Sequence, residues 1–266
     1  MKRIDLILQD HNIKTGKKCK YIEPNITEDC VFYENGKPIG FYVTKLPDKI
    51  NKLSNIANNE FLCKRVPKSN MKRTDAISKI KYGMPKEEAL KYEVEQMSTI
   101  IGSIPPKPLM RRSYKTISSV HSVKSAQTFI KAMLMLCIES EKLIKEILPE
   151  QYNRQKELFE NVPKKWRFGN LFTSSISNYN ISAPFHQDHG NIKETVNVII
   201  CKRLNSKGGD LHVPDYNATI GQTDNSMLVY PAWKNLHGVT PIIPIHEGGY
   251  RNSLIFYPLK AFMNHE

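Results

Sequence analysis

After Trp166 the chain changes in character, and this change most constrains its fold. Short strand-like runs follow one another, with residues that favour turns between them. The runs cover residues 168–176, 195–201, 210–213, 227–230, 238–243 and 253–257. Many short strands separated by polar turns favour an antiparallel sandwich or barrel. We therefore expect an all-β C-terminal half.

The preceding half has a mixed character. Residues 28–46 predict a β-hairpin, because strand-like runs flank Asn35-Gly36, which is a strong tight-turn signal. Residues 84–97 predict a helix, with Pro85 and two glutamates in its first turn, and the segment "GSIPPKP" at 102–108 ends it.

Apolar residues recur at spacings of three and four between residues 124 and 147, which predicts a helix with one buried stripe. Pro149 ends this helix, and a short polar helix is expected to follow up to Pro163. The first half of the chain therefore combines a hairpin with helices.

The chain has an excess of basic residues. It contains 39 Lys and Arg against 26 Asp and Glu, a formal net charge of +13. Such an excess attracts polyanions, most commonly nucleic acid, although a basic surface can also serve solubility. Residues 64–81 and 107–124 concentrate this charge, and we expect them to contact phosphates, with solvated faces as the alternative.

Neither the cysteines nor the apolar segments indicate a secreted or membrane protein. The five cysteines form no CxxC pair, so neither a disulfide framework nor a cysteine-based zinc site is expected. The N-terminus lacks the apolar region of a signal peptide, and no run of about 18 apolar residues predicts a membrane span. The expected location is the cytoplasm of a bacterium or a phage-infected host, or the nucleus in a eukaryote.

Two histidines and one aspartate have the character of a metal site. His186 and Asp188 are two positions apart, so on a β-strand they point to the same face. His237 lies at the start of a later strand-like run. Two imidazoles and one carboxylate that leave open positions form the facial triad of non-haem Fe(II) oxygenases. We expect these three residues to bind Fe(II).

Arg251 and Ser253 lie two positions apart on the last predicted strand. A guanidinium binds a carboxylate through two hydrogen bonds, and a hydroxyl can add another, so this pair suits a small dicarboxylate. The order His-x-Asp, His, Arg-x-Ser within an all-β half matches the 2-oxoglutarate-dependent oxygenases. That match implies a double-stranded β-helix fold, with Fe(II), 2-oxoglutarate and O₂ as cofactors and ascorbate as a reductant in vitro.

Four segments resemble the TET/JBP family, which oxidises the 5-methyl group of pyrimidines in nucleic acid. The segments are "TSSISNYNISAPFHQDHGN", "GGDLHVPDY", "HGVTPI" and "GYRNSLIFY", and the resemblance covers about residues 168 to 258. The hairpin region and "IIGSIPP" are more loosely similar to phage and kinetoplastid members.

The resemblance implies roles for individual residues. His186, Asp188 and His237 would bind Fe(II), and Arg251 and Ser253 would bind 2-oxoglutarate. Asn191 falls where TET enzymes have an asparagine that hydrogen-bonds a flipped base. TET enzymes have a histidine just before that asparagine, whereas this chain has Gly190 there. The cysteine-rich zinc-binding region of animal TET proteins is absent from this sequence.

Other polar and aromatic residues are weaker candidates for substrate contacts. Trp233 can stack on a base or pack in the core, and Arg111 and Arg112 can contact phosphates. His189 and His212 are expected at the surface or behind the metal ligands.

The predicted fold class is α+β, with a C-terminal double-stranded β-helix (jelly-roll) core, an N-terminal hairpin and supporting helices. Residues 1–123 would supply the hairpin, basic arm and a helix that packs on the core. Residues 124–266 would supply supporting helices and the dioxygenase core, the two parts forming one integrated domain.

The sequence and its resemblance predict a dioxygenase that hydroxylates the 5-methyl group of a pyrimidine in DNA, with 5-methylcytosine favoured over thymine. The target base would be flipped out of the duplex. Three alternatives remain: a thymine hydroxylase of the JBP kind, an RNA or protein hydroxylase of the same fold, and a catalytically silent DNA-binding module.

Overall fold

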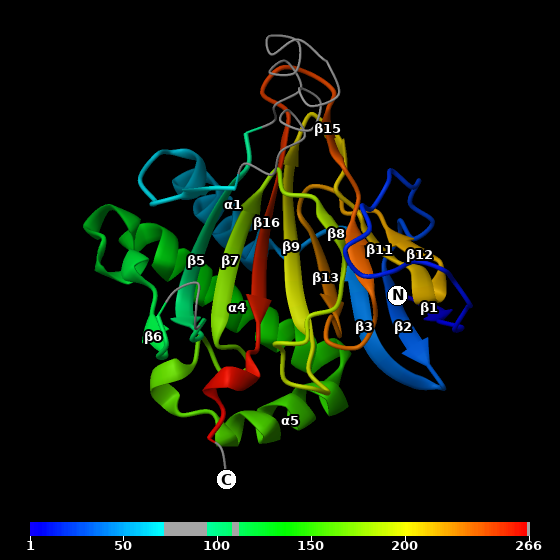
Figure 1. Cartoon of the computed structure of the whole chain (residues 1–266), viewed down its shortest axis with the longest axis horizontal. Coiled ribbons are helices and arrows are strands. Elements are labelled where there is room, and N and C mark those ends of the chain that lie inside the picture. Colours follow the sequence, from blue (N-terminus) through cyan, green and yellow to red (C-terminus); the bar gives the residue numbers. More distant parts are fainter. Residues whose placement is uncertain (72–94, 108–111, 265–266) are drawn as a thin grey trace.

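The computed structural model describes residues 1–71, 95–107 and 112–264, and within them two β-sheets lie face to face (Figure 1). The larger, the major sheet, has the strand order β1-β2-β3-β13-β9-β16-β7-β5-β4, with β6 beside β5. The smaller, the minor sheet, has the order β12-β11-β14-β8. This arrangement confirms the predicted jelly-roll core of an α+β fold.

The major sheet combines strands from both halves of the chain. They are β1 (Lys2–Asp5), β2 (Cys30–Glu34), β3 (Lys37–Val43), β4 (Ser69–Asn70), β5 (Met97–Ile104), β6 (Thr116–Ile117), β7 (Ser174–Tyr179), β9 (Asn197–Leu204), β13 (Ser226–Tyr230) and β16 (Tyr250–Tyr257). The central strands are antiparallel, and β1 pairs with β2 in parallel.

The minor sheet is built from short strands. They are β8 (Ala183–His186), β11 (Leu211–Val213), β12 (Ala218–Ile220) and β14 (His237–Val239). A separate pair is formed by β10 (Ser206–Gly208) and β15 (Ile242–Pro244). Apolar side chains from both sheets, among them Leu211 and Leu228, pack between them.

Helices cover the outer face of the major sheet (Figure 1). They are α1 (Asp48–Leu62), α4 (Gln127–Ile147) and α5 (Pro149–Leu158). Alternation along β9 explains the two layers, because Val198 and Ile200 face the helices while Ile199 faces the minor sheet. In the described part of the chain, no helix is long and apolar enough to cross a membrane.

Most predicted elements are present with shifted ends. The hairpin forms β2 and β3, and Asn35 and Gly36 both have the positive φ that its tight turn requires. The helix expected over 124–147 begins as a 3₁₀ turn and becomes α4 at Gln127. The single strand expected over 238–243 is two strands, because β14 joins the minor sheet and β15 pairs with β10.

The prediction for residues 84–108 was wrong where it can be compared. Residues 84–94 of the expected helix lie outside the described residues, but Met97 begins strand β5 rather than ending a helix. The segment Gly102–Ile104, expected to end that helix, continues the strand. Pairing with β7 along its length satisfies the backbone of β5, so tertiary context overrides the local sequence signal.

Helix α1 had no strong signal in the sequence. Its four asparagines have low helix propensity. Ile50, Leu53, Ala57 and Phe61 nevertheless lie on one side of the helix and are buried against α4 and the major sheet. Packing of this stripe therefore stabilises a helix that local propensity alone does not predict.

A buried carboxylate fastens α4 to the chain that leads into β7. Glu141 is 2% exposed, and its oxygens accept hydrogen bonds from the backbone N–H groups of Asn170 and Leu171 and from the Asn170 amide, at 2.7–2.9 Å. Gly169 lets the chain approach this closely, because a Cβ there would lie 2.5 Å from Glu141 Oε1 and 2.8 Å from Cys137 Sγ.

We expect Gly169→Ala to lower the free energy of unfolding by about 2–4 kcal/mol, since it adds this overlap to the cost of a φ of +73°. Gly248→Ala is the matched control, because Gly248 has a φ of +72° and open space around it. The control should cost only about 1 kcal/mol. An equal loss of unfolding free energy in both variants, measured by urea denaturation, would contradict the proposed overlap.

Candidate functional site

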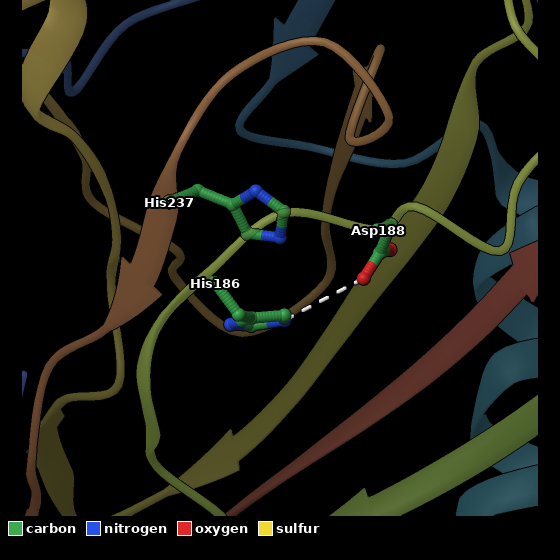
Figure 2. A group of neighbouring side chains, drawn as sticks. All are labelled: His186, Asp188 and His237. Atoms are coloured by element: carbon green, nitrogen blue, oxygen red, sulfur yellow. Dashed lines mark ion pairs between the residues drawn. The ribbon is translucent and has the colours of Figure 1, made fainter. Parts of the chain in front are cut away.

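His186, Asp188 and His237 lie together at one end of the space between the sheets (Figure 2). One potential ligand atom from each lies within 4.8 Å of the others. His186 Nε2 is 3.5 Å from Asp188 Oδ1, and the two imidazole centres are 4.5 Å apart. Strand pairing explains the approach, because His237 on β14 is directly opposite His186 on β8. The three predicted ligands therefore form a group that can hold one metal ion.

Backbone hydrogen bonds set which nitrogen of each histidine is free. Nδ1 of His186 lies 2.8 Å from the carbonyl oxygen of Pro184, and Nδ1 of His237 lies 3.0 Å from that of Asn235. A carbonyl only accepts, so each Nδ1 carries the proton and each Nε2 keeps its lone pair for a metal. Burial, followed by repulsion from His186, lowers the pKa of His237 and favours the neutral imidazole that binds metal.

Asp188 reaches the histidines from a turn and not from the strand, which corrects the sequence-based geometry. Strand β8 ends at His186, and the backbone N–H of Asp188 donates to Ala232 at 3.1 Å. The backbone N–H of Asn191 donates to the carbonyl oxygen of Asp188 at 2.9 Å and closes the turn. The His-x-Asp spacing thus still brings the two side chains together, through a turn.

Two amide side chains hold the Asp188 carboxylate. Asn197 Nδ2 donates to Asp188 Oδ2 at 3.1 Å, and Asn191 Nδ2 lies 3.4 Å from the same oxygen. Asn191 Nδ2 also donates to Asn197 Oδ1 at 2.9 Å. These contacts orient the carboxylate and leave its Oδ1 directed at His186.

A cavity of about 330 Å³ extends from the metal group between the two sheets. Its residues fall into three zones. The metal end contains His186, Asp188, Asn191, Asn197, Tyr230 and His237, the middle is aliphatic with Ile176, Ile199, Leu211, Val239 and Ile255, and the far end contains Asn178, Gln222, Arg251 and Ser253. Cross-strand pairing of Ile255 with Ile176 and Ile199 lines up the aliphatic zone on the major sheet.

The far end is cationic and closed. Arg251 is 2% exposed, and burial lowers the pKa of its guanidinium, which an arginine still keeps protonated. Its terminal nitrogen donates to Gln222 Oε1, while its Nε has no partner among the described residues. A buried cation with an unsatisfied hydrogen-bond donor can bind an anion such as a carboxylate.

The three zones fit 2-oxoglutarate in order. Its oxo acid would lie at the metal end, its two methylene groups along the isoleucines, and its distal carboxylate at Arg251. Ser253 lines the same far end, where its hydroxyl lies 3.4 Å from the carbonyl oxygen of Asn178. The sequence-predicted Arg251 and Ser253 are thus brought to one end of the cavity that begins at the metal ligands.

The weaker candidates that lie within the described residues do not line this cavity. Trp233 donates its indole N–H to the carbonyl oxygen of Thr195 and lines a separate pocket. Arg112 is exposed and lines another pocket beside β5 and β6, and Arg111 lies outside the described residues. His212 is 4% exposed and bonded to Thr219, which places it behind the cavity, and His189 is exposed.

Three cavity residues had no distinct signal in the sequence. Asn197 is the first residue of an apolar strand, Gln222 lies in a polar turn, and Tyr230 ends an apolar strand. Only the packing of the two sheets directs them to the same space. Asn197 is a polar residue at the start of a predicted buried strand, and this pattern is the one signal in the sequence that could have indicated a role in the site.

Asn197→Ala should weaken Fe(II) binding by about 10- to 100-fold, because it removes the donor that orients the Asp188 carboxylate. Asp188→Ala should abolish it. Asn178→Ala, in the same cavity but at the far end, is the control and should leave the affinity for the metal alone unchanged. Anaerobic Fe(II) titration of the purified variants tests this, and an unaffected Asn197→Ala would exclude the orienting role.

Comparisons with known proteins address the family and the fold of the chain. No curated protein sequence matches the chain. NgTET1, solved in complex with 5mC DNA, aligns with a TM-score of 0.59 and 13% identity over 97% of this chain and 85% of that one. A full-length protein of Neurospora crassa, solved in complex with alpha-KG, aligns with a TM-score of 0.41 and 12% identity over 82% of this chain and 75% of that one.

A 2OG-Fe(II) oxygenase family oxidoreductase from Burkholderia pseudomallei aligns with a TM-score of 0.44 and 13% identity over 85% of this chain and 88% of that one. The NgTET1 alignment supports the fold. The Tet_JBP family, described as the oxygenase domain of the 2OGFeDO superfamily, matches residues 106–260. Because this match spans more than half of the 266 residues, the chain belongs to the Tet_JBP family of oxygenases that use Fe(II) and 2-oxoglutarate.

Proposed function

We propose that this oxygenase hydroxylates the 5-methyl group of a pyrimidine in DNA, with 5-methylcytosine as the preferred base. Family membership supports an oxidoreductase, and the structure of NgTET1 with 5mC DNA supports the choice of substrate. When bound, Fe(II) with 2-oxoglutarate and O₂ supplies the oxidising power that an unactivated methyl group needs. The residues of this chain bind and orient the reactants.

The cavity is open at the metal end and closed at the arginine end. The side chains of His186 and Asp188 are 40% and 32% exposed, whereas Arg251 is 2% exposed. 2-Oxoglutarate would therefore lie deep in the cavity, and a base would approach from the open side. A methyl group in a stacked, paired base cannot reach such a site, so the nucleotide would be flipped out.

The orientation of the Asn191 amide carries the preference for cytosine. A carboxylate only accepts hydrogen bonds, so Asn197 must turn its NH₂ to Asp188 and its oxygen to Asn191. Asn191 must then turn its own NH₂ toward Asn197. Its Oδ1 remains as an acceptor on a residue that lines the cavity.

Cytosine and thymine differ in what they offer to this acceptor. Cytosine carries an amino donor at C4, whereas thymine carries a carbonyl acceptor there. Asn191 Oδ1 can accept from the amino group of 5-methylcytosine but would repel the carbonyl of thymine. The amide network around Asp188 therefore favours 5-methylcytosine.

Basic residues flank the open end. Residues 14–17 form a turn in which Gly16 has a φ of +84°. The N–H of Gly16 donates to the carbonyl oxygen of Phe185, and the N–H of Phe185 donates to the carbonyl oxygen of Lys17, next to His186. The turn carries the exposed residues Lys14 and Lys17.

Gly190, two residues after Asp188, shares a pocket with Pro105 and the exposed Lys260. We expect Lys14, Lys17 and Lys260 to bind the phosphates that flank a flipped nucleotide.

Nucleoside mass spectrometry tests the reaction. The protein is incubated with Fe(II), ascorbate and 2-oxoglutarate on two duplexes, one with 5-methylcytosine and one with thymine as its only methylated base. We expect 5-hydroxymethylcytosine from the first, no product from the second, and no product from Asp188→Ala on either.

Product from thymine alone would overturn the argument from Asn191 and indicate a JBP-like activity. Turnover of 2-oxoglutarate without product on any methylated DNA would contradict DNA as the substrate, and matched RNA substrates would then be tested.

A second test concerns the lysines beside β8. For a DNA duplex, the double variant Lys14→Ala/Lys17→Ala should reduce the slope of log affinity against log salt by about 1–2, because up to two phosphate contacts are lost. Lys52→Ala/Lys131→Ala is the control, since these exposed lysines lie on α1 and α4, across the major sheet from the cavity. Equal slopes for both variants in fluorescence anisotropy would argue against this DNA-binding surface.

A further inference from the structure

Two buried nitrogen atoms at the closed end of the cavity lack hydrogen-bond partners among the described residues. They are Nε of Arg251 and Nε2 of Gln222, and both residues are 2% exposed and line the cavity. Buried polar groups are nearly always hydrogen-bonded, and a buried donor with no partner is costly. Two unsatisfied donors in one closed space indicate a ligand that accepts from both.

The orientation of the Gln222 amide is determined by its neighbour. A guanidinium only donates, so the side-chain atom of Gln222 that meets the terminal nitrogen of Arg251 must be the oxygen. The NH₂ group is then the end left without a partner among the described residues.

The backbone of Gln222 is held on both sides. Its N–H donates to Asp210 Oδ1 at 2.9 Å, and its carbonyl oxygen accepts from Cys201 Sγ at 3.5 Å. The side chain therefore extends from a firmly anchored turn into the closed end of the cavity.

We propose that Gln222 binds the distal carboxylate of 2-oxoglutarate together with Arg251. Its Nε2 donates to one carboxylate oxygen, while its Oε1 keeps the guanidinium in place. This proposal rests on the use of 2-oxoglutarate by the family and not on the identity of the methylated substrate.

A neutral amide suits this position better than a carboxylate. Asp210 is already a buried acid beside this end of the cavity, at 3.8 Å from Arg203. A second acid at position 222 would neutralise Arg251 and repel the incoming carboxylate. The amide leaves the positive charge of Arg251 available to the co-substrate.

The test compares two ligands that differ only at the distal end. 2-Oxoglutarate has a carboxylate there, and 2-oxopentanoate has a methyl group on the same five-carbon chain. Calorimetric titration uses the intact protein loaded with Mn(II), which holds the oxo acid without turnover. The variants are Gln222→Met, which has a similar shape without the donor, and Gln222→Glu, which adds a charge.

We expect Gln222→Met to weaken binding of 2-oxoglutarate by about 10- to 100-fold, as for a hydrogen bond to a charged group. Binding of 2-oxopentanoate should change by less than about twofold, because that ligand has no carboxylate for Gln222. Gln222→Glu should weaken the binding of 2-oxoglutarate more than Gln222→Met does. Gln151→Met on α5 is the control and should change neither affinity.

Equal weakening of both ligands by Gln222→Met would mean that the substitution damages the cavity, and an unchanged affinity for 2-oxoglutarate would mean that Arg251 acts without Gln222. Either result overturns the proposal. If Gln222→Met does not fold, Gln222→Asn withdraws the amide by one methylene group and should give the same selective loss. The titration contains no nucleic acid, so a negative result here would leave the proposal of a DNA substrate unaffected.

Discussion

The pairing of β8 with β14 is the constraint on which the metal centre depends. It sets His186 directly opposite His237, and a slip of one residue would turn one imidazole away from the cavity. Gly238 allows this close pairing, because a Cβ there would lie 3.0 Å from atoms of both Phe185 and Cys19. The N-terminal turn at residues 14–17, the strand that carries His186 and the strand that carries His237 therefore pack as one unit, which joins the basic turn to the metal ligands.

The two ends of the cavity use the same physical device. At the metal end, the Asp188 carboxylate can only accept, so it orients Asn197 and through it Asn191. At the closed end, the Arg251 guanidinium can only donate, so it orients Gln222. In each case a charged group with one hydrogen-bonding role removes the freedom of an amide to flip. The free end of each amide then has a defined character: an acceptor at Asn191, which we propose faces the base, and a donor at Gln222, which we propose faces the co-substrate.

The sequence predicted the jelly-roll, and it selected five residues that the structure brings to one cavity. Strand periodicity holds for Arg251 and Ser253, whereas Asp188 reaches the site from a turn. The prediction from sequence failed where local signals were weak or misleading. Strand β5 carries the local signal of a helix end, since its pairing with β7 is not encoded in its own residues. Helix α1 is stabilised by burial against α4 despite its asparagines.

The sequence by itself determined which groups are available: two imidazoles, a carboxylate, an arginine with a serine, and an excess of basic charge. Their order along the chain indicated a 2-oxoglutarate-dependent oxygenase and its cofactors, and the resemblance of four segments indicated the family. Only the tertiary structure decided how the amides point and which end of the cavity is closed. Asn191, Asn197 and Gln222 come from different turns and strands, so their hydrogen bonds exist only after the sheets have packed. The proposed substrate preference depends on such long-range contacts, and residue spacing does not encode them.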